Sequence, residues 1–277
     1  MACRELKNCA VINDLSGFGR CALNISMPLM SALGVRTLPA PTAVLSNHTG
    51  FSEYYFSDLT DGMEEYFATW KKLGLTFDGI YTGFLGSEQQ VEIISSFIKE
   101  AKRGGTLLFV DPVMGDGGSL YSTYTEALVS RMRSLISGAD VITPNLTEAC
   151  FLADIPYADM ENATDEELIS LAKKLCSLGA KRAVITGIRR GAKVCNYVCD
   201  SLLGKTFTVS SKYVGGEFCG AGDIFTSLIA GYMLRGKSFK FAILRASRFL
   251  SRAARLSLEL GVSPTDGIAF EPILKKI

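Results

Sequence analysis

Short apolar runs alternate with longer amphipathic segments along most of the chain, a pattern typical of strands followed by helices. Buried strands are predicted at residues 9–12, 79–82, 107–110, 141–143 and 183–186. Helices are predicted at residues 23–33, 91–102, 165–178 and 224–233. The alternation predicts an α/β fold with a central, mainly parallel sheet covered by helices on both faces.

Local signals mark where several of these elements begin and end. Ser87 to Gln90 and Thr164 to Glu167 have the spacing of capping boxes, and Gly179 is suited to end the helix that Thr164 begins. Residues 194–209 alternate apolar and polar side chains around a turn, which predicts an antiparallel hairpin. Because no repeat, low-complexity tract or linker interrupts the pattern, we expect residues 1–277 to form a single domain.

Charge and hydropathy exclude several classes of partner. Lys and Arg number 29 against 28 Asp and Glu, so no basic surplus indicates nucleic-acid binding. The sequence shows neither an apolar run long enough for a membrane span nor the apolar core of a signal peptide, so we expect a cytoplasmic protein with small-molecule partners. The eight cysteines are scattered and His48 is the only histidine, which predicts reduced thiols and no structural zinc site.

Polar and glycine-rich segments follow each of these five predicted strands and a further strand that ends before residue 46. Any one of them could be an ordinary turn, but the carboxyl ends of parallel strands share one edge of a sheet, where ligands collect. We therefore expect a single long groove along this edge. The segments are residues 13–19, 46–49, 82–87, 111–118, 143–148 and 186–187.

The segment from Gly220 to Asp223 lies directly before an apolar helix. Its glycines permit a tight turn and a close approach to a ligand, and the free amides of the first helical turn form an anion site. A carboxylate in this position suits a base beside a bound phosphate. For the isolated motif, a simple capping role for Asp223 is the better interpretation, and the segments upstream shift the balance towards catalysis.

These segments resemble, in order and over nearly the whole chain, the pyridoxal kinases of the ribokinase-like superfamily. The resemblance implies a ribokinase-like fold and ATP-dependent phosphorylation of the 5′-hydroxymethyl group of vitamin B6 vitamers. It also implies Mg²⁺, with K⁺ as a further candidate cofactor, and a homodimer. The motifs that carry it are Ser46-Asn47-His48-Thr49, Thr82 to Ser87, Asp111-Pro112-Val113-Met114-Gly115, Thr143-Pro144-Asn145 with Glu148, and Gly220 to Asp223.

The resemblance assigns the catalytic and metal-binding roles. Asp223 matches the family's base, which takes the proton of the substrate hydroxyl, and the amides of Gly220, Ala221 and Gly222 would stabilise the transferring phosphoryl group. Asn145 and Glu148 match an NxxE motif that suits magnesium, with the alternative that Asn145 caps a helix and Glu148 lies in its first turn.

The remaining assignments concern the two substrates. The resemblance places Asp111, Asp116, Tyr121, Thr186 and Gly187 near ATP, although Asp111 could equally brace its loop and Thr186 could merely end a strand. On the vitamer side it places Asp14, Ser16, His48, Thr49 and Phe84, with core packing as the alternative for the aromatic rings.

Asp14 departs from the family pattern, because many members have serine there. A carboxylate at this position would alter the preference among pyridoxal, pyridoxine and pyridoxamine, and related hydroxymethylpyrimidine kinases often have an acidic residue in this segment. A kinase of hydroxymethylpyrimidine or a related small alcohol is therefore the main alternative function. A non-catalytic ligand-binding protein of the same fold is a further one, disfavoured because base, anion loop and metal motif are all present. Cys219, next to the glycine loop, is either a packing residue or a reactive thiol.

Overall fold

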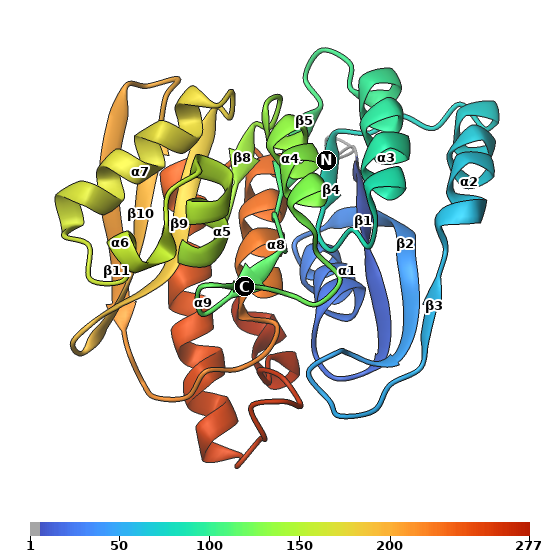
Figure 1. The fold of residues 1–277 in the computed structure, drawn as a ribbon. Coiled ribbons are helices and arrows are strands. Elements are labelled where there is room, and N and C mark those ends of the chain that lie inside the picture. The colour runs from blue at the N-terminus through green and yellow to red at the C-terminus, as the bar shows by residue number, and fades with distance from the viewer. Residues whose placement is uncertain (1–5) are drawn as a thin grey trace, which may run out of the picture.

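The computed structural model describes residues 6–277, and a nine-stranded sheet runs through the whole described chain (Figure 1). The strand order across the sheet is β11-β10-β9-β8-β5-β4-β1-β2-β3. The strands are β1 (Lys7–Phe18), β2 (Val35–Asn47), β3 (Phe56–Asp58), β4 (Gly79–Thr82), β5 (Leu107–Val110), β8 (Val141–Ile142), β9 (Arg182–Arg190), β10 (Lys193–Asp200) and β11 (Lys205–Lys212). A separate two-stranded ribbon joins β6 (Gly115–Asp116) and β7 (Ser119–Leu120).

The six central strands, from β9 to β2 in spatial order, run parallel to one another. The edge strands β3, β10 and β11 are antiparallel to their neighbours, and β10 and β11 form the predicted hairpin. The predicted α/β class with a mainly parallel sheet is therefore confirmed, and the structure has the ribokinase-like architecture.

Helices cover both faces of the sheet. Val11 and Ile12 are both fully buried although they point to opposite faces, which requires a core on each side. One core includes α1, α8 and α9, and the other includes α2, α3, α4, α5 and α7. The helices are α1 (Ala22–Ala32), α2 (Thr60–Lys72), α3 (Glu88–Ala101), α4 (Glu126–Ile136), α5 (Leu146–Ala153), α6 (Tyr157–Met160), α7 (Asp165–Ser177), α8 (Ala221–Leu234) and α9 (Phe239–Glu259), followed by the 3₁₀ segment Glu271–Lys276.

The first two strands are much longer than the sequence pattern predicts. The segments at 13–19 and 46–47, expected as loops, are largely strand, because β1 and β2 stay paired beyond the sheet edge as far as Phe18 and Asn47. Each strand supplies the other's hydrogen-bonding partner, so polar side chains do not end the pairing. The paired ends of β1 and β2 thus form a ribbon that projects beyond the sheet, and Phe18 lies at its tip. Phe18 is 55% exposed, and its ring packs against Phe51 with ring centroids 5.5 Å apart.

Strand β9 also runs past its predicted end. It continues to Arg190, because β10 pairs with it, and the register shifts opposite residues 185–188. Thr186 and Gly187 therefore lie within an irregular stretch of strand and do not follow it. Gly187 has a φ of +78°, a conformation that favours glycine at such a bulge.

The predicted helix caps are present, with one difference. Thr164 and Glu167 form a reciprocal capping box at the start of α7. At α3, Ser87 accepts a hydrogen bond from the Gln90 amide, but the Gln90 side chain turns to the Gly86 amide instead of completing the box.

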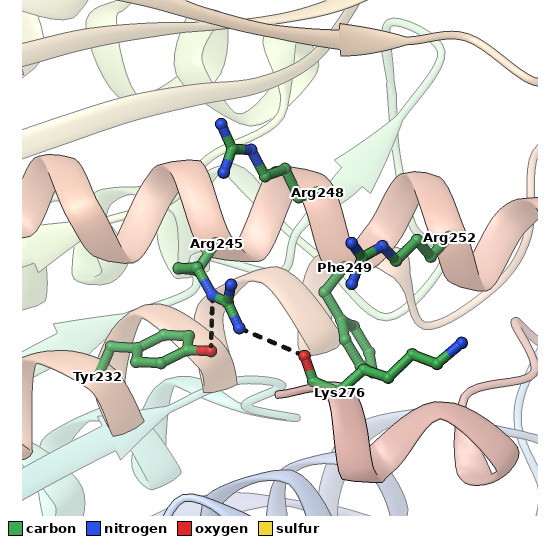
Figure 2. A pocket seen from close by; sticks show the side chains of 6 residues that line it. All are labelled: Tyr232, Arg245, Arg248, Phe249, Arg252 and Lys276. Atoms are coloured by element: carbon green, nitrogen blue, oxygen red, sulfur yellow. Dashed lines mark hydrogen bonds between the residues drawn. The ribbon is translucent and has the colours of Figure 1, made fainter.

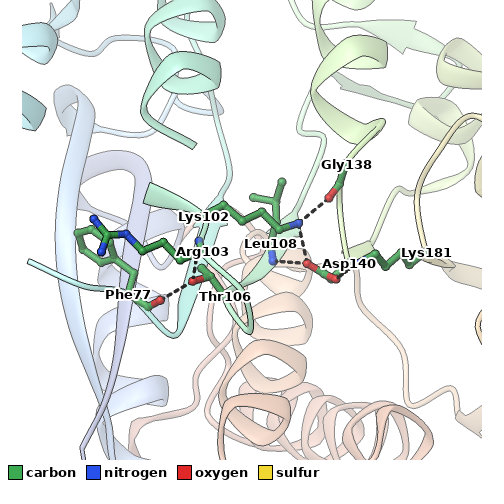
Figure 3. A network of polar contacts seen from close by, with 8 residues as sticks. All are labelled: Phe77, Lys102, Arg103, Thr106, Leu108, Gly138, Asp140 and Lys181. Carbon is green, nitrogen blue, oxygen red and sulfur yellow. Dashed lines mark hydrogen bonds and ion pairs between the residues drawn. The ribbon is translucent and has the colours of Figure 1, made fainter. Parts of the chain in front are cut away.

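At the amino ends of the central strands, a buried carboxylate joins several elements (Figure 3). Asp140 pairs with Lys102 at 2.9 Å and Lys181 at 2.8 Å, and it accepts a hydrogen bond from the Leu108 amide at 2.8 Å. Its pKa lies below the ordinary value although burial opposes this, because these donors favour the ionised form.

A second polar contact fastens the last described segment to the helical layer (Figure 2). Arg245 of α9 donates to the Tyr232 hydroxyl and to the Lys276 carbonyl oxygen, both at 3.3 Å. None of the helices in residues 6–277 combines the length and apolar character needed to cross a bilayer. The seven cysteines within this range are all free, and Cys3 lies outside the described residues.

Candidate active site

The amino end of α8 meets the carboxyl ends of β1, β4 and β5 at one edge of the sheet. Asp223 of α8 accepts a hydrogen bond from Asn13 of β1, and Thr226 of α8 donates to Asp111, which follows β5, at 3.2 Å each. The chain order reverses beside β1, since β2 lies on one side of it and β4 on the other. Open parallel sheets bind ligands at such a reversal. The sheet edge where the groove was predicted is therefore the edge where α8 meets β1, β4 and β5.

The glycine loop before α8 is held by close backbone contact. Gly220 has a φ of +83°, and a Cβ atom there would lie 2.2 Å from the Arg20 carbonyl oxygen. Within the described chain no side chain caps the start of α8, whose first turn holds Ala221, Gly222 and Asp223. Uncapped first-turn amides at a helix start form a site for an anion such as phosphate.

Asp223 lies in the first turn of α8 and is half-buried. Burial raises the pKa of its carboxyl group well above the ordinary value, and the negative charge of Asp111 raises it further. The Ala22 amide acts in the opposite direction by hydrogen bonding. A carboxylate whose pKa is raised binds a proton more readily, which is the property a general base needs.

Asp111 is buried against the same helix. Its Oδ2 accepts from Thr226, whose hydroxyl also shares a 2.7 Å hydrogen bond with Thr143. Burial raises its pKa, and the two threonine hydroxyls lower it. A Cβ atom at Gly222 would lie 3.7 Å from Oδ2, so the carboxylate borders the glycine loop.

Asn145 and Glu148 form a reciprocal capping box at the start of α5. Glu148 is 4% exposed, and its two carboxylate oxygens accept from the amides of Met114 at 3.2 Å and Asn145 at 2.8 Å. Asn145 also donates to the Gly115 carbonyl oxygen. The capping alternative therefore describes the observed contacts, and the magnesium role stays a prediction.

The donor set around Glu148 is compatible with a cation. Burial and the charge of Asp111 both raise the pKa of Glu148, and within residues 6–277 no Lys or Arg forms an ion pair with either carboxylate. Each carboxylate oxygen keeps a lone pair beyond the hydrogen bond it accepts, and hard oxygen donors suit Mg²⁺. The described residues do not, however, gather three acidic, His or Cys side chains into a ready-made metal cage.

The remaining predicted ATP residues line the edge from β6 to β9. Asp116 is exposed and accepts from the Gly117 amide, and Tyr121 is 44% exposed. Burial raises the pKa of Tyr121, and the charges of Glu148, Asp116 and Asp111 raise it further. Thr186 donates to the Pro144 carbonyl oxygen, and Gly187 leaves open space where a Cβ atom would stand.

Asp14 and Ser16 are buried on β1, on the vitamer side of the predicted groove. The Ser16 hydroxyl donates to Asp14 Oδ2 at 3.0 Å, and the Asp14 amide donates to Asn13 Oδ1. Burial raises the pKa of Asp14 to about 6, although the hydrogen bond from Ser16 opposes this.

The ring of His48 is held by two backbone contacts. Its Nδ1 accepts from the Gly50 amide, and Nε2 donates to the Thr265 carbonyl oxygen at 2.7 Å. Gly19 permits this placement, because a Cβ atom there would lie 2.5 Å from the ring. Thr49 beside it is exposed, and the half-buried ring of Phe84 lies 6.3 Å from that of Tyr124.

Cys219 is a half-buried free thiol before α8. The neighbouring Cys21 and His48 side chains lower its pKa, although burial opposes this. Both sequence interpretations, a packing residue or a reactive thiol, stay predictions.

Two polar side chains of this site were missed at the level of sequence. The sequence motifs include Asn13 only within the polar segment 13–19, and they do not include Thr226. A signal for Asn13 did exist, because Cys9 and Val11 belong to the core shared with α8 and the strand period of two places Asn13 on the same face. Thr226 contacts Asp111 across 115 positions of sequence, so no local pattern reveals it.

Comparison with known proteins gives a consistent result. Residues 29–266 match the family model described as phosphomethylpyrimidine kinase. Pyridoxine kinase of Bacillus subtilis is 32% identical over 201 residues, which cover 69% of this chain and 70% of that enzyme.

Solved structures agree over almost the full length. A protein of Bacteroides thetaiotaomicron, described as a candidate phosphomethylpyrimidine kinase and crystallised with pyridoxal, is 39% identical with a TM-score of 0.94, covering 98% of this chain and 96% of its own. Pyridoxal kinase of Lactobacillus plantarum is 30% identical with a TM-score of 0.90, at the same coverages.

Proposed function

The chain belongs to the phosphomethylpyrimidine kinase family, and from this premise we propose that it phosphorylates the 5′-hydroxymethyl group of vitamin B6 vitamers with ATP. The observation that carries the proposal is the position of Asp223, a carboxylate of raised pKa in the first turn of the uncapped helix α8. Base and anion site are thus adjacent, as transfer of a phosphoryl group to a hydroxyl requires. The Bacteroides relative crystallised with pyridoxal supports the choice of substrate.

The chemistry follows from this arrangement. Asp223 accepts the proton of the vitamer's hydroxymethyl group. At the same time the hydroxymethyl oxygen bonds to the γ-phosphorus of ATP. The bond from that phosphorus to the bridging oxygen breaks, and ADP leaves with the electron pair. The amides of Gly220, Ala221 and Gly222 stabilise the negative charge of the transferring group. Glu148, Asn145 and Asp111 would hold Mg²⁺, which when bound neutralises charge on the phosphates.

The vitamer pocket lies along β1 and β2. Asp14, Ser16, His48 and Thr49 provide its polar wall, and Phe84 provides a ring face against the pyridine. Phe18 and Phe51 at the ribbon tip are positioned to shield the site from water. Asp116, Tyr121, Thr186 and Gly187 then border the nucleotide at the other end of the groove.

A hydroxymethylpyrimidine kinase is the second candidate, favoured by the matched family model and by the acidic Asp14 in the pocket. Both substrates are flat heteroaromatic alcohols, so the same base and loop would serve either. A panel of pyridoxal, pyridoxine, pyridoxamine, hydroxymethylpyrimidine and its phosphate, measured by coupled ADP formation, separates the two. The highest kcat/KM on a pyrimidine would overturn the vitamer proposal.

The base is tested by Asp223→Asn. This variant keeps the shape and removes the basicity, so kcat should fall roughly a hundredfold or more while ATP still binds. Asp61→Asn is the matched control, since Asp61 is an exposed carboxylate in the first turn of another helix, α2. A near wild-type rate for Asp223→Asn would show that another group takes the proton.

A further inference from the structure

Asn13 lies where the strands β1 and β4 separate, and it is 1% exposed. Their paired residues end at Ile12 and Thr82, followed by one last backbone hydrogen bond of 2.9 Å from the Gly83 amide to the Ile12 carbonyl oxygen. Beyond this point the side chain of Asn13 replaces the missing backbone partner. Its Oδ1 accepts from the Phe84 amide at 2.8 Å and from the Asp14 amide at 3.0 Å.

These two donors fix the orientation of the carboxamide. Because the oxygen faces two backbone N–H groups, the nitrogen must point the other way. There Nδ2 donates to Asp223 Oδ1 at 3.2 Å, across 210 positions of sequence. The hydrogen bond is therefore set by the backbone of β1 and of the loop after β4, and not by rotation of a free side chain.

Gly83 makes room for this group. A Cβ atom at Gly83 would lie 2.3 Å from Asn13 Nδ2, 2.5 Å from Cγ and 2.6 Å from Oδ1. Gly83 is not one of the glycines with a positive φ, so its backbone conformation would accept other residues. Clearance for the Asn13 carboxamide thus accounts for the glycine.

We propose that Asn13 is a positioning residue for the base, which holds Asp223 Oδ1 in place and favours its ionised form. The inference rests on the proposed function, in which Asp223 takes the substrate proton. The same carboxamide binds the amide of Phe84, so it also ties the base to the segment that carries the aromatic face of the vitamer pocket.

The electrostatic surroundings make this donor important. The titratable groups that face Asp223 are Asp111 after β5, Asp14 on β1, Cys219 before α8, Tyr81 on β4 and Cys21 before α1. The negative charges of Asp111, Asp14 and Cys219 oppose ionisation of the base, whereas Tyr81 and Cys21 have raised pKa values and stay neutral. The N–H groups of Asn13 and Ala22 act against them.

The sharpest test is Asn13→Asp, because it preserves shape and the oxygen that accepts from the Phe84 and Asp14 amides. It replaces the donating nitrogen with an oxygen, so the pKa of Asp223 should rise. We expect the acid limb of the kcat/KM profile to move up by about one pH unit or more, equivalent to one charge-assisted hydrogen bond. Asn13→Ala should move it in the same direction, with the KM for ATP within about twofold of wild type.

Gly83→Ala provides an independent route to the same effect, since its methyl group displaces the carboxamide without changing Asn13. Gly104→Ala is the control, because a Cβ atom there meets nothing within 4 Å and the residue lies outside the groove segments. We expect the shifted acid limb in Gly83→Ala and the wild-type profile in Gly104→Ala. A wild-type acid limb in folded Asn13→Asp would overturn the proposal. If instead Asp223→Asn kept full activity, the assignment of the base would be wrong. That result is distinguishable from a failure of the Asn13 proposal, in which Asp223→Asn is inactive and the Asn13 variants keep the wild-type acid limb.

Discussion

Replacing Asp14 with serine tests whether this buried carboxylate distinguishes among vitamers. Asp14 is 9% exposed, its one side-chain partner is the Ser16 hydroxyl, and its pKa is about 6. By the usual titration relation it is roughly nine-tenths ionised at pH 7 and about one-tenth ionised at pH 5. Within residues 6–277 no Lys or Arg forms an ion pair with Asp14, and the aminomethyl group of pyridoxamine would supply a cationic partner.

The magnitude follows from one differential interaction. Pyridoxamine and pyridoxal share the ring nitrogen, the 3-hydroxyl and the reacting hydroxymethyl group, so contacts to these cancel in a ratio of specificity constants. A single charged hydrogen bond that only pyridoxamine makes is worth about 1.4 kcal/mol, or about tenfold. We expect Asp14→Ser to lower the pyridoxamine-to-pyridoxal ratio of kcat/KM by about this factor at pH 7.5.

The pH dependence gives the same test without a mutation. In the wild type the ratio should fall as pH drops through about 6, because protonation removes the charge of Asp14. Protonation of Asp223 affects both vitamers alike, because the base serves both, so it cancels in the ratio. Asp14→Ser and the isosteric Asp14→Asn should both give a flat ratio. Equal losses on every vitamer, with the wild-type ratio and its pH dependence intact, would show that Asp14 only supports β1.

Three further substitutions have defined outcomes. Glu148→Gln should raise the Mg²⁺ concentration for half-maximal rate by about fivefold, and an unchanged titration would leave only the capping role. Gly220→Ala should lower kcat at least tenfold, since its Cβ atom would meet the Arg20 carbonyl oxygen at 2.2 Å, whereas Gly138→Ala, with open space around its Cβ atom, should behave as wild type. Asp140→Asn should cost about 2 kcal/mol of unfolding free energy in urea. That cost should shrink as pH falls below about 4, because the pKa of Asp140 is lowered in the folded state; a cost independent of pH would contradict the charge argument.

Hydrophobic periodicity was sufficient for the central sheet and failed at its edges. The predicted strands at 79–82 and 107–110 match β4 and β5, since fully buried strands are continuous apolar runs bounded by turns. The predicted end of β1 was wrong by several residues, because Asn13, Asp14 and Ser16 look like loop residues in isolation. Their strand conformation depends on pairing with β2, which no local pattern reports.

The candidate site shows the same division. Motifs located Asp223, Asp111 and Glu148 at one sheet edge, and the structure places Asp111, which follows β5, against α8, whose first turn carries Asp223. The contacts that hold them come from elsewhere, namely Asn13 on β1 and Thr226 further along α8. Glu148 was expected at an open strand edge and is instead buried, because the Met114 and Asn145 amides enclose its carboxylate.

The two ends of the parallel sheet use carboxylates in opposite ways. At the amino ends, Asp140 has two lysine partners, its pKa is lowered, and its charge contributes to stability above the unfolded pKa. At the carboxyl ends, Asp111, Glu148 and Asp223 have raised pKa values and no ion pair within residues 6–277. Ionising them therefore lowers stability as pH rises through their folded pKa values. Under the proposed function, a bound cation and the positive end of α8 would offset this repulsion, so the same charges that weaken the free protein would favour metal and nucleotide binding at this edge.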